Sequence, residues 1–465
     1  MRRFLLLFFA LILLGCTTVQ AQGAPQRYGH GYRYERAHWI YLHLEGSPYQ
    51  IGLQHGRLLA PEIADALAAS RLDQTHDTGR PWSFFRTTAR TVLWPQIDSE
   101  YRAELRGIAA GAKLDLWDIV ALNAKEEVPD YYVPWLDARE KRVDAPKLKA
   151  PGNCSAFVAT GAWTRDHKPV IAHNNWTGFL EGERWRVVFN IHPTHGESIL
   201  MDGYPGMISS GDDFGINSAQ LAITETTITG FSSFDPKQTP EFVRARKAMQ
   251  YARSIDDYVR IFLEHNNGGY ANDWLLADYK SGEIARFEAG LKLHKLWRSK
   301  DGYFVGANFP SDPEFIKTET DFDPTNLASS PNARHLRWDE LMADNKGKLD
   351  AELAKQLLAD HWDSYEKRVN AGDRSICGHI HTSSRGVPEW EWKPFTPAGS
   401  VNSKVADAAL ATRFSFAARA GLSCGEDFLA DAFQRAHPEF DWQKPLLHDM
   451  KGNPWVEFQS DRAHK

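Results

Sequence analysis

The sequence predicts a layered domain of helices and β-strands, and three observations support this fold class. Residues 23–150 show mainly helical spacing of apolar side chains after one short strand. From residue 154 the pattern changes to short runs that are typical of β-strands. Helices are expected again in the last third of the chain. A strand-rich middle flanked by helices indicates sheets covered by helical layers.

In the N-terminal part, one strand is expected near residues 39–44, followed by three helices. The first helix contains Gly52 and Gly56, four residues apart, which would allow another element to approach closely. The second helix covers residues 101–112, and the third begins after Asp115, a candidate N-cap. The apolar residues that define the first helix are Ile51, Leu58, Leu59, Ile63 and Leu67.

A charged segment, residues 139–152, contains two prolines and no apolar periodicity, which predicts an exposed loop. An interdomain linker would have the same composition. The loop leads directly to Asn153 and Cys154. The strands expected after it are residues 155–160, 169–173, 185–191, 197–201 and 215–227. A helix over 242–263, a hairpin of 273–278 and 283–288, and helices over 333–343 and 349–359 follow, with loops elsewhere.

The first 22 residues have the features of an export signal. Arg2 and Arg3 precede an apolar run at residues 4–14, which is shorter than the ~20 residues that span a bilayer. The run ends in Leu-Leu-Gly-Cys16, similar to a bacterial lipobox, so we favour lipidation of Cys16 and a tether to the outer membrane. Cleavage after Ala21, giving a periplasmic or secreted protein, is the alternative. The net charge of −6 argues against a nucleic-acid binder.

The remaining cysteines differ in their surroundings. Cys377 and Cys424 could pair in an oxidising compartment. His379 and His381 are a weak metal-binding pattern, and the sequence has neither Cys-x-x-Cys nor His-Glu-x-x-His, so we expect no metal and no cofactor. Cys154 has no other cysteine in its region.

Cys154 follows a loop and is expected to begin a strand, which suits one particular chemistry. If the bond after Asn153 is cut, Cys154 carries both a thiol and a free α-amine, whose pKa lies near ~8. The amine can then accept the proton of the thiol, so nucleophile and base come from one residue. A lone cysteine at a strand start is also a common buried apolar residue.

Several segments resemble the phospholipase B-like proteins, which belong with the penicillin acyltransferases and acid ceramidase-type amidases among N-terminal-nucleophile cysteine hydrolases. The resemblance covers roughly residues 40–430 and rests on the order and spacing of its motifs. The motifs are residues 153–158 (NCSAFV), 173–177 (HNNWT), 204–206 (YPG), 210–214 (SGDDF), 225–227 (ETT) and 272–274 (NDW). Upstream, residues 104–111 (ELRGIAAG) and 52–56 (GLQHG) are similar to the acyltransferase precursors.

The resemblance implies an α+β fold of four layers, αββα, with two stacked antiparallel sheets between helices. It also implies cleavage between Asn153 and Cys154. The chain then divides into a signal at 1–22, a mostly helical part with the pro-loop at 23–153, and a catalytic part at 154–465. We expect the last two parts to form one integrated domain.

The resemblance further implies roles for residues around the nucleophile. Asn272 and Asn217 match site asparagines of relatives, and Asn272 would donate to the oxygen that becomes negative. His173 and Asn174 would orient the α-amine or the leaving group, and Arg334 would polarise the nucleophile.

Each of these residues has a structural alternative. Asn217 could cap a turn, Asn272 could simply enter a strand, and Arg334 could lie on a helix surface. His173 and Asn174 could form a structural hydrogen-bonded pair. The adjacent Asp212 and Asp213 are expected to be structural, and Thr177, where many relatives have Asp, bears on substrate more than on mechanism.

The function expected is hydrolysis of an acyl amide or ester through a thioester at Cys154. The substrate would be small and lipid-like, such as a lysophospholipid or an N-acyl amine. Transfer of the acyl group to an amine is the enzymatic alternative. A non-catalytic envelope lipoprotein that retains the fold is the alternative of another class.

Overall fold

The structure is a computed structural model, and it describes residues 24–140, 153–211, 214–231 and 233–461. The predicted signal with Cys16, most of the loop at 139–152, and the pair Asp212 and Asp213 lie outside the described residues. No helix in the described ranges is both long and apolar enough to cross a membrane.

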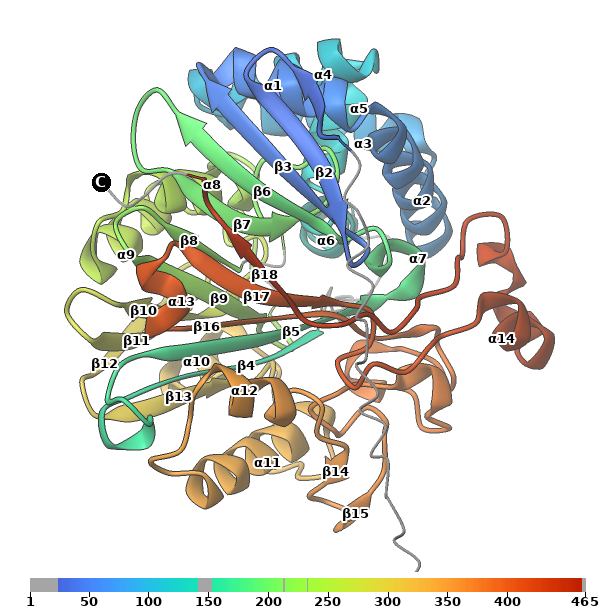
Figure 1. The fold of residues 1–465 in the computed structure, drawn as a ribbon. Coiled ribbons are helices and arrows are strands. Elements are labelled where there is room, and N and C mark those ends of the chain that lie inside the picture. The colour runs from blue at the N-terminus through green and yellow to red at the C-terminus, as the bar shows by residue number, and fades with distance from the viewer. Residues whose placement is uncertain (1–23, 141–152, 212–213, 232, 462–465) are drawn as a thin grey trace, which may run out of the picture.

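Two stacked β-sheets form the centre of the molecule (Figure 1). Within the described residues the larger sheet has ten strands, in the order β1-β2-β3-β6-β7-β8-β9-β10-β11-β12. Neighbours are antiparallel except β3 and β6, which are parallel. The strands are β1 (Gln26–Tyr28), β2 (Gly31–Arg36), β3 (Trp39–Gly46), β6 (Val187–Pro193), β7 (Ile199–Gly203), β8 (Gly215–Asn217), β9 (Leu221–Thr227), β10 (Asn272–Asp278), β11 (Glu283–Ala289) and β12 (His294–Ser299).

The smaller sheet has six strands among the described residues, all antiparallel, in the order β13-β4-β5-β16-β17-β18. Its strands are β4 (Asn153–Thr160), β5 (Val170–Gly178), β13 (Gly302–Gly306), β16 (Ala398–Asp407), β17 (Ser415–Ala420) and β18 (Val456–Gln459). A separate pair consists of β14 (Trp362–Asp363) and β15 (Arg368–Val369). The apolar side chains between the two sheets include Val158, Ile171, Ile216, Leu275 and Phe416.

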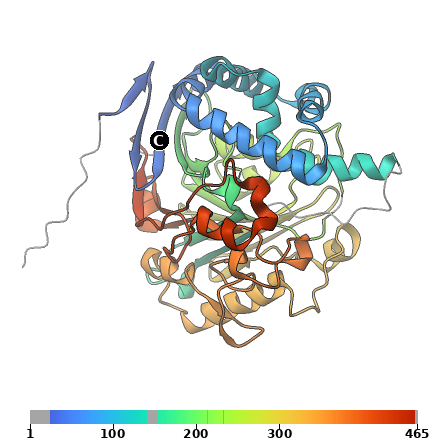
Figure 2. The same cartoon turned by 90° about the vertical axis from the view of Figure 1, so that its right-hand side faces the viewer.

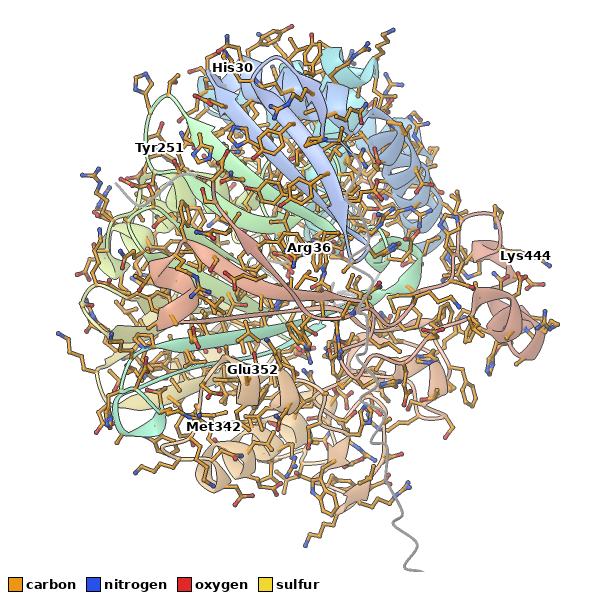
Figure 3. The ribbon with its side chains drawn as sticks, in the orientation of Figure 1. His30, Arg36, Tyr251, Met342, Glu352 and Lys444 are labelled. Carbon is orange, nitrogen blue, oxygen red and sulfur yellow. The ribbon has the colours of Figure 1, made fainter. Side chains whose placement is uncertain are left out.

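Helices cover both outer faces, so the four-layer αββα arrangement is confirmed (Figure 2). The larger sheet packs against α1 (Pro48–Leu58), α2 (Ala60–Thr78), α3 (Trp82–Thr88), α4 (Ser99–Ala112), α5 (Leu116–Asn123), α8 (Glu241–Tyr251) and α9 (Ile255–Leu263). The smaller sheet packs against α11 (Ser330–Asp344) and α12 (Ala351–Leu357), on which Figure 3 labels Met342 and Glu352. Shorter helices are α6 (Val133–Arg139), α7 (Phe179–Gly182), α10 (Pro313–Glu319), α13 (Ala408–Thr412) and α14 (Ala430–Ala436).

The glycines of the first helix bring α1 and α4 into backbone contact, as their spacing predicted. A Cβ atom on Gly52 would lie 1.9 Å from the Glu104 carbonyl oxygen, and one on Gly56 would lie 2.2 Å from that of Ile108. Gly107 of α4 makes the reciprocal approach to α1. This packing buries Glu104, whose carboxylate pairs with Arg246 of α8 at 2.8 Å.

Several predicted elements need correction. The N-terminal part has two strands, β1 and β2, ahead of the predicted one. Residues 215–227 form two strands that turn at Gln220, which has φ of +62°. The helix predicted over 242–263 is divided by Ser254, whose side chain caps α9. The predicted C-terminal loops contain β16, β17 and β18.

Candidate active site

Cys154 is the second residue of β4 and is 1% exposed. It lies directly opposite Asn175 of β5. Since directly opposite residues of antiparallel strands project to the same face, Cys154 and Asn175 share a face, and so does His173, two residues from Asn175. This is the face that carries Ala156 and Val158 into the core between the two sheets.

The thiol of Cys154 lies beside an imidazole and a carboxylate. Its Sγ atom is 3.6 Å from Oε1 of Glu225 on β9. One ring nitrogen of His173, one carboxylate oxygen of Glu225 and the sulfur all lie within 4.8 Å of one another. The hydroxyl of Tyr270 donates to the same Glu225 oxygen at 3.2 Å. Glu225 and His173 are therefore two groups near the thiol that can accept its proton.

Two side chains hold the backbone of Cys154. The N–H of Cys154 donates to the side-chain oxygen of Asn308 at 3.2 Å, and the amide of Asn308 donates to the Thr227 carbonyl at 2.8 Å. Arg334 donates to the Cys154 carbonyl at 2.7 Å and to the Asn308 side-chain oxygen at 2.9 Å. The peptide units on both sides of the Cys154 α-carbon are thus fixed from the β13 end and from α11.

Arg334 is fully buried rather than on a helix surface, the alternative that the sequence left open. Its guanidinium also donates to the Ser155 hydroxyl at 3.0 Å and to the Ala307 carbonyl at 3.2 Å. The guanidinium carbon lies 4.4 Å from the centre of the Trp176 ring. Burial lowers the pKa of Arg334 to about 9, and a thiolate at Cys154 would oppose this shift.

The structure places Asn174 away from the thiol. Asn174 is opposite Ser155 and projects to the helix-covered face of the sheet. Its amide donates to the carbonyls of Leu358 and Ile376, at 2.7 and 3.1 Å. The expected role of Asn174 in orienting the α-amine or the leaving group is therefore corrected. Side chains alternate along β5, so His173 and Asn175 share the face of Cys154 and Asn174 does not.

Asn217 also has its partners elsewhere. It ends β8, and its amide donates to the carbonyls of Met249 and Ala252 at the end of α8, at 3.1 and 2.8 Å. Its side-chain oxygen accepts from the N–H groups of Ala219 and Leu221. This is the turn-capping arrangement that the sequence left open as the alternative to a site role.

Asn272 is the first residue of β10, opposite Thr227 of β9. Glu225 is two residues from Thr227, so the side chains of Asn272, Thr227 and Glu225 project from one face of the larger sheet. Asn272 is fully buried, and neither its side-chain nitrogen nor its side-chain oxygen has a hydrogen-bond partner among the described residues. Buried polar groups are normally hydrogen-bonded, so the Asn272 amide has the capacity to bind a further group.

Three residues of this arrangement, Asn308, Glu225 and Asn175, had no role predicted from the sequence. Asn308 follows β13 and is 154 positions from Cys154 in the chain, so only the fold brings it there. Glu225 and Asn175 belong to two of the motifs that resemble the family, ETT and HNNWT. The alternation of side chains along β5, once β5 is paired with β4, is the signal that selects Asn175 instead of Asn174.

A family model described as Phospholipase B matches residues 82–298. The resemblance to the phospholipase B-like proteins is confirmed. The matched range includes Cys154, His173, Glu225 and Asn272, while Asn308 and Arg334 follow it.

Individual relatives match over part of their length. The chain is 32% identical over 162 residues to putative phospholipase B-like 1 of Caenorhabditis elegans, covering 32% of this chain and 28% of that one. It is 40% identical over 139 residues to phospholipase B-like protein G of Dictyostelium discoideum, covering 28% and 23%. The matches thus span about a quarter of the length of these relatives.

Solved structures match as well, among them an acylase and a hydrolase. Penicillin V acylase from Agrobacterium tumefaciens has a TM-score of 0.35 and 13% identity, covering 57% of this chain and 83% of that one. A mutant of the conjugated bile acid hydrolase from Clostridium perfringens has a TM-score of 0.33 and 11% identity, covering 57% and 89%.

Proposed function

We propose that this protein is a self-processing cysteine hydrolase that cleaves acyl amides or esters through a thioester at Cys154. The observation that carries the proposal is that the Cys154 sulfur, a ring nitrogen of His173 and a carboxylate oxygen of Glu225 lie within 4.8 Å of one another. The N–H of Cys154 is in addition bound by Asn308. A thiol that only fills the core would need neither an imidazole nor a carboxylate beside it.

In the maturation step, the thiol gives its proton to Glu225 or His173 and its sulfur attacks the carbonyl carbon of Asn153. The C–N bond to Cys154 breaks, the acyl group is carried on sulfur, and the nitrogen takes up a proton. Water then hydrolyses the thioester and releases the Asn153 carboxylate. Asn308 and Arg334 would hold Cys154 in place while this happens.

In the catalytic cycle, the new α-amine accepts the thiol proton and the sulfur attacks the substrate carbonyl. The amine or alcohol leaves with that proton, and water clears the acyl group as a carboxylic acid. Negative charge develops on the carbonyl oxygen before the leaving group departs. The Asn272 amide, buried and without a partner among the described residues, is the donor we assign to that oxygen.

The substrate class is part of the proposal and is supported by the names of the curated relatives, which are phospholipase B-like. We propose a small molecule with an apolar acyl chain, joined through an ester or an amide. An exported protein tethered through Cys16 would meet such molecules at the cell envelope. Acyl transfer to an amine stays as the second activity of the same thioester.

The first test is the state of the purified chain. A denaturing gel with N-terminal sequencing should show a fragment that begins at Cys154 in the wild type and one uncut chain in Cys154→Ala. Incubation with lysophosphatidylcholine and with an N-acyl amine, with and without added hydroxylamine, separates hydrolysis from acyl transfer by the products. An uncut wild-type chain whose Cys154 does not react with iodoacetamide under native conditions would contradict the proposal.

A further inference from the structure

A second group of reactive side chains lies outside the active site. It consists of His361, Cys377, His379 and Cys424, each offering one nitrogen or sulfur, and these four atoms lie within 4.8 Å of one another. Cys377 and His379 are buried, and the other two are half-buried. Both cysteines are free thiols in the structure. We propose that these four residues bind one zinc ion.

The distances between the four atoms fit a single cation at their centre. Nε2 of His379 is 3.4 Å from Sγ of Cys377, 3.5 Å from Sγ of Cys424 and 3.1 Å from Nε2 of His361. A tetrahedral zinc ion with ordinary Zn–S and Zn–N bonds separates its ligands by about 3.5 Å from S to N and about 3.3 Å from N to N. The three distances therefore match the edges of a Cys₂His₂ zinc tetrahedron.

Hydrogen bonding alone does not account for this cluster. A single ring nitrogen of His379 is approached by three atoms at once. A neutral imidazole nitrogen either donates one hydrogen or offers one lone pair, so it can satisfy only one of the three. A cation at the centre interacts with all four atoms together, provided that the cysteines are thiolates.

The surrounding backbone holds the ligand-bearing segments in register. The N–H of Cys377 donates to the carbonyl of Asp360, next to His361, at 3.0 Å, and the N–H of His379 donates to that of Gly372 at 3.1 Å. The site is thus assembled from the segment after α12, the loop before β16 and the loop after β17, which are distant in sequence. This spread explains why the sequence offered only the weak pair His379 and His381.

Asn174 connects the same three segments from the sheet. Its amide donates to the carbonyls of Leu358 and Ile376, and its oxygen accepts from the Ser423 hydroxyl at 2.8 Å. Ile376 and Ser423 directly precede the two cysteines. A buried side chain that is hydrogen-bonded to the neighbours of two ligands can act as an outer partner that orients a metal site.

The zinc site would also support the active site, through Trp176. Gly378, between two ligands, lies so close to Trp176 that a Cβ on it would be 2.6 Å from the indole ring. The guanidinium of Arg334 also lies over the Trp176 ring, 4.4 Å from its centre, and donates to the Cys154 carbonyl. With four protein ligands and no open position, the ion is structural in kind, and it would fix the loop that contacts Trp176.

The test is the metal content of the intact protein, purified without chelator. We expect inductively coupled plasma mass spectrometry to find one zinc per chain. A mercurial reagent that blocks thiols should release that zinc to a metallochromic dye. Cys377→Ser and His361→Ala should lose most of the zinc, whereas His381→Ala, two residues from His379, should retain it. Cobalt in place of zinc should give the thiolate-to-cobalt charge-transfer band and the strong visible bands of a tetrahedral site.

Three outcomes would overturn the proposal. One is an intact-protein and peptide mass showing a Cys377–Cys424 disulfide in the protein as purified. The second is a wild type that takes up no zinc although both thiols react freely. The third is zinc that stays at one per chain in Cys377→Ser and in His361→Ala. The metal analysis and the release assay use the wild type alone. They can therefore still refute the proposal if a variant fails to fold.

Discussion

The side-chain oxygen of Asn308 accepts a hydrogen bond of 3.2 Å from the N–H of Cys154. The same oxygen accepts a hydrogen bond of 2.9 Å from Arg334, and the Asn308 amide donates to the Thr227 carbonyl. Asn308 has φ of +66°, a conformation that asparagine tolerates better than most residues. One asparagine thus links both sheets and α11 to the nitrogen of the bond proposed to be cut.

We predict that Asn308→Ala slows self-cleavage by on the order of 100-fold, because the N–H of Cys154 loses its acceptor and Arg334 loses one of its partners. The rate can be followed by the appearance of the fragment beginning at Cys154 on denaturing gels. Asn217→Ala is the matched control, since it removes a buried asparagine whose partners are on α8. It should lower thermal stability and leave the cleavage rate of the folded protein unchanged. Equal cleavage rates for both variants would contradict the role of Asn308.

How far the sequence predicts this fold is clear from particular elements. Gly52 and Gly56 predicted a close helix contact because their spacing of four is a local property, and Asp115 predicted a helix start because its side chain caps α5 at the N–H of Trp117. The strand β16 was missed because its buried positions include Ser403 and Lys404, so no apolar pattern marks it. The lysine is neutralised by an ion pair with Asp202 from the other sheet, which no local pattern reveals.

The candidate site shows the same division. Cys154 was identifiable from the loop before it and the motif around it, both local. The register that puts Asn175 opposite Cys154, and Asn174 opposite Ser155, depends on how two strands pair. Asn308 and the zinc ligands depend on loops that only the complete fold brings together.

Asn174 and Asn175 project to opposite faces of the smaller sheet, and this difference gives a second prediction. Asn175→Ala should lower kcat and leave the zinc content unchanged, because its side chain shares the face of the thiol. Asn174→Ala should weaken zinc retention against a competing chelator by about 10- to 100-fold, because it removes the outer partner of the ligand segments. Activity assays and metal analysis on both variants separate the two effects. If Asn174→Ala kept its zinc as firmly as the wild type, the outer-partner role would be wrong.

A third prediction concerns the contact between α1 and α4. Gly52→Ala should destabilise the protein by about 1–3 kcal/mol or more, because the new Cβ meets a backbone carbonyl that cannot move aside. This clash outweighs the gain of roughly 1 kcal/mol that alanine brings to a helix interior. Gly178→Ala serves as the control, since nothing lies within 4 Å of the added atom. Thermal melting should show a loss for the first variant and little change for the second; a stabilised Gly52→Ala would exclude the backbone contact.

The fourth prediction is the effect of pH on His55. This residue of α1 is buried, and its Nε2 accepts a hydrogen bond of 3.0 Å from the N–H of Gly206, which requires a neutral ring. Burial lowers its pKa from 6.5 to about 3, and the charge of Arg246 adds to this effect. The unfolded chain therefore binds a proton below pH 6.5 that the folded chain does not bind. The stability that His55 contributes is present above pH 6.5 and is lost as the pH falls towards 3.

Between pH 7 and pH 5 this residue should cost the folded state about 2 kcal/mol. Urea unfolding at the two pH values measures the cost, in a Cys154→Ala background so that one uncut chain is compared. His55→Gln, which keeps an acceptor for Gly206 but does not titrate, should lose about 2 kcal/mol less over the same range. His30→Gln is the control, because His30 is exposed on the turn labelled in Figure 3 and should leave the wild-type slope unchanged. A His55→Gln protein with the same pH slope as the wild type would show that His55 is not the group that makes the fold sensitive to acid.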